Sequence, residues 1–484
     1  GKAEAMILAE KVAEVPSTAG AALAESIHAL VRSAANPGQL ASLTVDYPLD
    51  ESVFPPEIVP PTFLWHEPTE RADTWLIHVA FAGGQHLSIL VPGDPPPAGE
   101  IDPRAVADSN EVYQPTPYQA SAKAWTPTDE TWAAIKQRST GQPARITISG
   151  FHSGEATKPL SLAQISMTTS TDPVGAPIFY RDVPLAPSAT EDGVIKPLSE
   201  AVVPMIAWRL RDISKPDSRL LLTDMLNCTN CHSFSADGKT LGMDLDGPKG
   251  DKGAYVIAPV AKQMVIEQKH VISWNSFPDK PQDHKTIGFL SQISPDGQFA
   301  VTTLNEKVFV SNFWDYKFLQ VFYPTRGILG YYRRATGEIK ALPGADDPHY
   351  VHCDPAWAPD GKYLIFARAE AVDPYPPGRP RPTHADDPAE TPVQYDLCRL
   401  PFNDGLGGQP EAVEGASRNG MSNNFPKVSP DGKWIVFVQC RNGQLLRPDS
   451  KLWIVPAGGG TPRLMRCNTS RMNSWHSFSP NSRW

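Results

Sequence analysis

The sequence predicts a mainly β protein, and three observations lead to this fold class. The 484-residue chain contains 50 prolines, about twice the average share of roughly 5%, which favours short strands and loops over a helical bundle. After Leu40, short segments alternate between apolar and polar positions, as half-buried strands do. In the second half of the chain, a strand–turn–strand pattern recurs five times. A repeated β unit is therefore expected to dominate the architecture.

Residues 1–40 are the part of the chain in which we expect helices. Residues 3–35 are rich in Ala, Glu and Leu and are broken by Pro16. This composition predicts two short helices, with Ser17 or Thr18 as the N-cap of the second. For the first helix, a loosely ordered tail is the alternative.

Residues 41–175 read as a separate β domain. Proline-punctuated strand segments such as TWLIHVAF (74–81) and ARITISGF (144–151) follow one another. They predict a small immunoglobulin- or fibronectin-like β-sandwich, with one helix at DETWAAIKQR (129–138). Four tryptophans are expected in its core: Trp65, Trp75, Trp125 and Trp132.

The recurring pattern is an apolar strand, a Ser-Pro-Asp-Gly-type turn and a second, alternating strand. Proline pre-sets the turn and glycine ends it, so each copy predicts a β-hairpin. Hairpins extended to four strands can pack radially as the blades of a β-propeller. We predict such a propeller over residues 176–484, with five visible blade starts and six or more blades in the full protein, the C-terminus being incomplete. The five copies cover residues 233–245, 292–304, 356–368, 427–439 and 477–484.

A C-x-x-C-H motif, Cys228-Thr229-Asn230-Cys231-His232, directly precedes the first copy. In this motif the two thiols bind the vinyl groups of a haem covalently, and the histidine becomes the proximal iron ligand. Three alternatives stay open. A zinc site would need further ligands, a redox dithiol would be expected in a βαβ setting, and a plain disulfide or a chance match would have no cofactor.

A second histidine shares the repeat position of His232. When the five turns are set in register, His476 of the fifth copy falls at this position. Strands that begin at one mouth of a propeller would project both side chains from the same rim, so His476 is a candidate distal iron ligand. Alternatively, His476 only forms a hydrogen bond there. The other three copies carry Ser291, Pro355 and Pro426 at this position.

The repeats resemble the TolB-like family of WD-type propeller repeats. Ala236 departs from the turn pattern in the first copy, and Asn481-Ser482 departs from it in the last. The combination with C-x-x-C-H is similar to the haem-binding propeller of the catalytic subunit of hydrazine synthase and to exported relatives with TolB-like repeats. This resemblance covers only the propeller, and it implies one haem c on Cys228, Cys231 and His232. Because such haem is attached after export, it also implies a periplasmic or extracellular protein.

The leading functional expectation is an exported c-type cytochrome that transfers electrons. Its partners would be a redox protein or subunits of a membrane-associated complex, bound through the propeller faces and the N-terminal domain. One alternative is a haem enzyme acting on a small oxidant such as peroxide or a nitrogen oxide, with His476 or His352 as acid–base group and His349 as a further candidate. Another is an interaction scaffold with a structural haem. The net charge of −9 and the lack of a long basic run disfavour nucleic acid, and no apolar run reaches the length of a membrane span.

The implied export affects four further cysteines. Cys353, Cys398, Cys440 and Cys467 would meet oxidising conditions and could pair in three ways. Cys440 with Cys467 is the first choice, because both lie in the same predicted blade.

Overall fold

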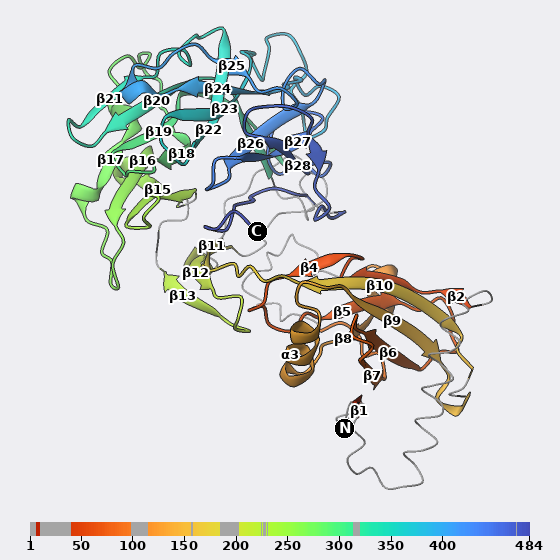
Figure 1. Ribbon diagram of the computed structural model, residues 1–484. Helices are drawn as coiled ribbons and strands as arrows, with labels where there is room; N and C mark the ends of the chain where they lie inside the picture. The colour runs from red at the N-terminus through yellow and green to blue at the C-terminus, as the bar shows by residue number, and fades with distance from the viewer. Residues whose placement is uncertain are drawn as a thin grey trace. The chain divides into compact units, whose positions relative to one another are not determined.

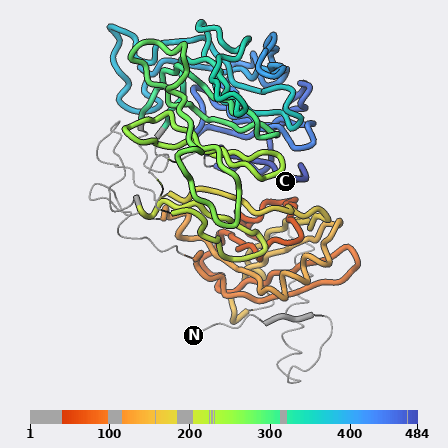
Figure 2. The backbone as a smooth tube through the Cα atoms, turned by 90° about the vertical axis from the view of Figure 1, so that its left-hand side faces the viewer, coloured from red at the N-terminus to blue at the C-terminus, as the bar shows by residue number. Residues whose placement is uncertain are grey.

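The protein, seen here as a computed structural model, is mainly β, as the sequence predicts (Figures 1 and 2). It consists of two compact units, each described below by itself. The first contains Gly1–Ile101, Val112–Ile178 and Leu210–Arg219, and the second contains Asp102–Glu111, Phe179–Arg209 and Leu220–Trp484. Among the described residues, no helix is long and apolar enough to cross a membrane. The structure describes residues 6–9, 40–97, 115–155, 158–183, 203–223, 225, 229, 231–312, 320–470 and 472–484.

In its described residues, the first unit contains two sheets and two α-helices. The larger sheet has the order β1-β7-β6-β9-β10-β2, and β4 also pairs with β10. The smaller sheet has the order β3-β5-β8. The strands are β1 (Met6–Ala9), β2 (Ala41–Ser42), β3 (Thr44–Tyr47), β4 (Ser52–Phe54), β5 (Phe63–His66), β6 (Thr74–Ala80), β7 (His86–Val91), β8 (Lys123–Trp125), β9 (Ala144–Phe151) and β10 (Ser161–Thr169), and the helices are α2 (Pro117–Ser121) and α3 (Asp129–Arg138).

Both sheets and α3 share one apolar core. Trp65, Trp75, Trp125 and Trp132 are all buried in it, which confirms their predicted role. Helix α3 covers the predicted segment, and the Thr128 side chain caps it by accepting the Thr131 backbone N–H. Strand β10 pairs in parallel with β2 and with β4. The immunoglobulin- or fibronectin-like assignment stays a prediction.

The predicted helix over the first residues is wrong at Met6–Ala9. These residues form β1, which pairs antiparallel with β7 and sets Ile7 opposite Ile89. The edge of β7 offers backbone donors and acceptors that a short apolar segment can satisfy, and a run of four residues is too short to show a helical period. The rest of the predicted segment, including Ser17 and Thr18, lies outside the described residues.

The second unit contains four successive four-stranded antiparallel sheets, named here sheets I to IV. A single parallel bridge, Gly327 with Val351, joins sheets II and III. Sheet I contains β14 (His232–Phe234), β15 (Thr240–Gly247), β16 (Asp251–Pro259) and β17 (Val271–Ser273); sheet II contains β18 (Phe289–Ile293), β19 (Phe299–Asn312), β20 (Gln320–Arg333) and β21 (Glu338–Ala341). Sheet III contains β22 (Tyr350–Trp357), β23 (Tyr363–Glu370), β24 (Asp396–Pro401) and β25 (Glu411–Ala412); sheet IV contains β26 (Ser422–Val428), β27 (Trp434–Cys440), β28 (Lys451–Pro456) and β29 (Arg463–Leu464).

A three-stranded sheet precedes sheet I in the sequence. It has the order β11-β12-β13, with bounds Ile178–Asp182, Ala207–Arg211 and Ser218–Leu222. Short 3-10 helices occur at Ser153–Glu155, Val203–Met205, Pro248–Gly250, Gln268–His270, Trp274–Ser276 and Asn403–Gly405.

The predicted turns open each of the four sheets, and their side chains explain the repeated sequence. In sheet II the Ser294 hydroxyl donates to Asp296 Oδ1 and accepts the Phe299 backbone N–H, while Asp296 Oδ1 also accepts the Gln298 N–H. Gly297 closes the turn with a φ of 70°. The fifth copy forms the same turn without glycine, because Asn481 replaces the aspartate as acceptor and Ser482 takes a φ of 59°. The Ser-to-Asp contact recurs in sheets I and IV at Ser235–Asp237 and Ser429–Asp431.

The turn glycine of sheet IV gives a first prediction. Gly432 has a φ of 71°, and an added Cβ would meet only ordinary van der Waals contact. Gly432→Ala should therefore cost only the backbone strain of the left-handed region, about 1–2 kcal/mol of unfolding free energy. Urea unfolding measures this loss. Gly458→Ala is the matched control, since its site is open and its φ is not positive; an equal loss in both variants would contradict the turn assignment.

Candidate haem-attachment site

The second half of the C-x-x-C-H motif is anchored by the first hairpin of sheet I. Cys231 directly precedes β14, and its carbonyl accepts the Asp244 backbone N–H at 2.9 Å. His232 is the first residue of β14 and lies opposite Met243 on β15. Cys228 lies outside the described residues. The hairpin therefore fixes the backbone of Cys231 and His232.

The His232 imidazole is held by aromatic rings. Its centroid lies 4.8 Å from that of Phe179 and 5.0 Å from that of Trp208, with interplanar angles of 84° and 87°. Phe179 and Trp208 stack on each other at 5.1 Å, and Phe234 lies 6.0 Å from the imidazole. Edge-to-face contacts of this kind fix the orientation of a ring.

His232 is neutral at pH 7. Burial lowers the pKa of its imidazole to about 4, with Lys427 acting in the same direction and a hydrogen bond with the Phe179 backbone opposing both. The neutral form is the one that ligates a metal, because its free ring nitrogen keeps a lone pair. His232 is thus prepared as a ligand without a proton having to be displaced.

The Cys231 side chain faces an apolar cluster formed by the other sheets. It packs against a group that includes Leu290 of β18 and Phe425 of β26. Burial, with a smaller contribution from the Asp244 carboxyl, raises the pKa of the Cys231 thiol well above its usual range. The thiol is therefore neutral and lies among apolar side chains.

Cys231 occupies a position that recurs in every copy, four residues before the first turn residue. We call it the inner repeat position. Its other members have left-handed φ values between 47° and 58°, and a register shift in the first hairpin of sheets II, III and IV falls at it. The chain therefore bulges at equivalent points of these three hairpins. The members are Cys231, Leu290, Asp354, Phe425 and Trp475.

Four ionisable side chains lie within electrostatic reach of Cys231, and sequence reasoning did not select them. They are Asp244, Asp354, Arg181 and Lys427. Burial raises the pKa of Asp244 to about 8 and that of Asp354 to about 7, and it lowers the pKa of Lys427. The repeat register could have revealed Asp354, because it holds the same position as Cys231.

Haem c is the group that C-x-x-C-H implies, and the described residues fit it. The candidate proximal ligand is a neutral, aromatically packed imidazole, and the described attachment thiol lies among apolar side chains. Thr229, between the two cysteines, has a buried hydroxyl without a hydrogen-bond partner. A buried orphan hydroxyl is costly, which is consistent with a further group at this loop.

The structure does not bring His476 into contact with His232. His476 Nε2 is hydrogen-bonded to the Val436 carbonyl at 3.0 Å, and its ring meets Phe425 edge-on at 5.5 Å. Its Nδ1 is buried without a partner, and burial lowers the pKa of the imidazole to about 3. Among the ring contacts of the described residues, none joins the two histidines. His476 thus forms a hydrogen bond to the fold, and its role as a distal iron ligand stays a prediction.

His352, a candidate acid–base group of the haem-enzyme alternative, does not face solvent. Its side chain is fully buried, with Nε2 hydrogen-bonded to the Asp347 carbonyl and the ring packed on Phe366. Burial lowers the pKa of His352 to about 4. His352 lies on β22, where every second side chain points to the same face of the sheet, and its own side chain points to a buried face. His349 is exposed and pairs with Asp347 at 2.9 Å.

The predicted Cys440–Cys467 disulfide is also wrong. Both cysteines are free, and Cys440 is buried whereas Cys467 is exposed. Cys440 lies on β27 and Cys467 follows β29, with β28 between these strands. Two strand spacings amount to roughly 10 Å, beyond the separation of about 7 Å that a disulfide tolerates between Cα atoms. Cys353 and Cys398 are free and buried as well.

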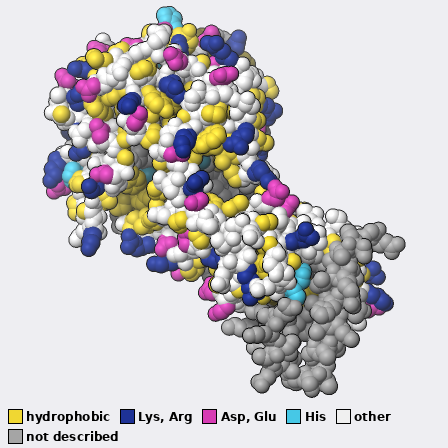
Figure 3. Space-filling model, in the orientation of Figure 1, with side chains coloured by type: hydrophobic (Ala, Val, Ile, Leu, Met, Phe, Trp, Pro, Cys, Tyr) yellow, Lys and Arg dark blue, Asp and Glu magenta, His cyan; other side chains and the backbone are white. Residues whose placement is uncertain are grey.

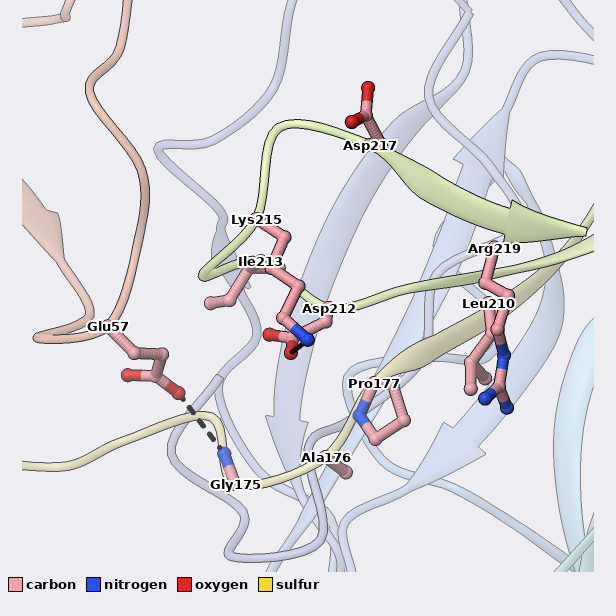
Figure 4. Close-up of a pocket in the computed structure, with 10 residues that line it drawn as sticks. All are labelled: Glu57, Gly175, Ala176, Pro177, Leu210, Asp212, Ile213, Lys215, Asp217 and Arg219. Carbon is pink, nitrogen blue, oxygen red and sulfur yellow. Dashed lines mark hydrogen bonds and ion pairs between the residues drawn. The ribbon is translucent and has the colours of Figure 1, made fainter.

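A pocket of about 410 Å³ lies in the first unit (Figure 4). Glu57 accepts the Gly175 backbone N–H at its edge, and Lys215 pairs with Asp212 at 3.8 Å. The lining holds three carboxylates, two cations and no histidine or cysteine. On the face of the molecule that Figure 3 shows, cationic and anionic side chains are likewise interspersed.

The sequence matches no protein-family model and no curated protein. Among solved structures, it is similar to dipeptidyl peptidase 4 of Porphyromonas gingivalis (12% identity, TM-score 0.29), over 54% of this chain and 36% of the other. It is similar to the GH74 enzyme of Niastella koreensis at 8% identity and a TM-score of 0.30, over 53% of this chain and 42% of the other. It is also similar to a puromycin hydrolase at 12% identity and a TM-score of 0.31, over 69% of this chain and 44% of the other. The chain thus spans less than half the length of each. At these TM-scores the likenesses carry no argument about this protein.

Proposed function

We propose that residues 176–484 form a β-propeller that carries one haem c on Cys228, Cys231 and His232, and that the protein is an exported c-type cytochrome that transfers electrons. The observation that carries the proposal is the C-x-x-C-H motif at the head of sheet I, with His232 neutral and held by Phe179 and Trp208. The export, the periplasmic or extracellular location and a redox partner protein or complex are parts of the same proposal.

The order of the sheets supports the propeller. Their first strands meet in sequence order, β14 with β18, β18 with β22 and β22 with β26. Successive turns also touch, since the Ala236 N–H donates to the Pro295 carbonyl and the Asp431 N–H to the Ser482 hydroxyl. Serial contact of the first strands is the arrangement that radial packing requires.

The residues of this chain do three things in the proposed role. Haem, when bound, supplies a one-electron couple whose potential depends on its axial ligands and on its burial. Cys228 and Cys231 tether it, and His232 offers an imidazole whose orientation is fixed by its aromatic contacts. The apolar cluster around Leu290 and Phe425 excludes water from the Cys231 side of the site.

The hydrogen bond of His476 favours a second candidate function. Because the Val436 carbonyl engages Nε2 of His476, only its buried, partnerless Nδ1 could offer a lone pair to a haem iron. If Nδ1 stayed within the fold, the position opposite His232 would be open. An open position would suit a haem enzyme acting on a small oxidant such as peroxide or a nitrogen oxide.

Electron paramagnetic resonance of the ferric protein separates the two functions. Electron transfer with two axial ligands predicts a low-spin signal, and His476→Ala should convert it to high spin if His476 leaves Val436 to bind the iron. His349→Ala is the control, since its side chain is 88% exposed, and it should leave the spectrum unchanged. A high-spin wild-type signal would contradict the electron-transfer proposal and favour the enzyme, and a folded protein that never binds haem would leave only the scaffold.

A further inference from the structure

Asp354 is a buried carboxylate directed at the same cluster as the haem-attaching cysteine. It stands at the inner repeat position of sheet III, as Cys231 does in sheet I. Only 3% of Asp354 is exposed, and its Oδ2 accepts the Phe425 backbone N–H at 3.1 Å. Cys231 packs against the cluster that contains Phe425. Asp354 and Cys231 therefore approach one group of side chains from two different sheets.

Few charged groups near Asp354 stabilise its ionised carboxylate. Lys427 of sheet IV is the cation that acts on it; this residue is partly buried, and its Nζ lies 4.7 Å from the Phe425 ring centroid. The Asp354 charge also affects the pKa values of Cys231, Cys353 and Tyr395. Burial raises the pKa of each of these groups above its usual range, so all three are neutral at pH 7.

The charge on Asp354 is finely balanced near neutral pH. Burial raises the pKa of its carboxyl to about 7, against the opposing effects of the Phe425 N–H, Gln444 and Lys427. A nearby positive charge lowers the pKa of a carboxyl, and removal of that charge raises it. A change of one unit of charge in the same cluster would therefore move Asp354 between its two protonation states.

We propose that Asp354 is the proton-accepting residue that couples the redox change of the haem to proton uptake; this inference rests on the proposed function. With haem bound, an external one-electron reductant would supply the electron, and a hydronium ion of the solvent would supply the proton. One O–H bond of the hydronium ion would break, one O–H bond to the Asp354 carboxylate would form, and the total charge of the buried cluster would stay constant. Asp354 acts on the reduction potential and is not an iron ligand.

The test is a mediated redox titration of the haem-loaded protein between about pH 5 and pH 9, which brackets the Asp354 pKa of about 7. In wild type the potential should fall by about 59 mV per pH unit where Asp354 titrates, since one proton accompanies one electron. Asp354→Asn should remove this slope, while its amide oxygen can still accept the Phe425 N–H. Glu370→Gln, an exposed carboxylate at the end of β23, is the matched control and should keep the slope.

A second variant tests the proposal independently of whether Asp354→Asn folds. Lys427→Met removes the cation that favours the Asp354 carboxylate, so the sloped region should move to higher pH. A haem-loaded wild type without a slope, or an unchanged slope in Asp354→Asn, would overturn the inference while leaving the cytochrome intact. Protein without haem would overturn the proposed function, and this inference with it.

Discussion

Cys228→Ser/Cys231→Ser should contain no covalently bound haem. Serine cannot form the thioether bonds to the haem vinyl groups, so any haem that still enters the site would be held only by coordination and packing. After export in a host that matures c-type cytochromes, the denatured variant should lose all haem staining on a gel, whereas wild type retains it.

Cys467→Ser is the matched control for this experiment. Cys467 is exposed and follows β29, the last strand of sheet IV, away from the motif in sequence, so its replacement should leave the haem in place. If the Cys228/Cys231 double variant still carried covalently bound haem, the attachment site would have to lie elsewhere in the chain.

Glu390→Gln should destabilise the second unit by about 1.5–3 kcal/mol, because it removes the buried carboxylate paired with Arg447 and leaves only Asp386, which is more than half exposed, as a counter-ion. The Arg447 side chain is 1% exposed and pairs with Glu390, whose side chain is 3% exposed. Glu390 also accepts hydrogen bonds from Tyr323 at 2.6 Å and from Asn442 at 3.0 Å. Loss of the charge weakens the whole network, which ties the loop before β24 to β20 and to the loop after β27.

Urea unfolding followed by tryptophan fluorescence measures this effect. Glu338→Gln is the control, because its pair with Lys340 is half exposed, and exposed pairs contribute at most about 1 kcal/mol. Equal losses in the two variants would show that the buried pair does not hold the loop.

The local repeat explains why much of the fold could be predicted. Ser294, Asp296 and Gly297 each satisfy a backbone requirement of one turn, so the same residues recur wherever the hairpin recurs. Thr128 and the residues after it likewise specify α3 through a cap and charged ends that complement the helix dipole. Interactions within a few residues leave a direct trace in the sequence.

The features that could not be predicted depend on residues far apart in the chain. Strand β1 forms because β7 offers an edge, and Glu390 is buried because Arg447 lies opposite it. The proline-rich segment that contains Glu390 looks like a solvated loop by composition alone. No local pattern encodes such pairings.

In the candidate site, too, local features could be predicted from the sequence, whereas contacts between residues far apart in the chain could not. The motif gives Cys228, Cys231 and His232 by spacing, and the repeat register gives the equivalence of His232 with His476. The aromatic contacts of His232 come from Phe179 and Trp208, which precede the motif by 20 residues or more. Equivalence in the repeat does not create contact, and His476 bonds to Val436 instead.

The central claim, a single covalent haem on the C-x-x-C-H motif, is tested most directly by the intact mass of the exported protein after denaturation. The chain should be heavier by one haem, and the peptide that carries the addition should contain both Cys228 and Cys231. A denatured chain at its unmodified mass, with both of these thiols free to react with an alkylating reagent, would contradict it.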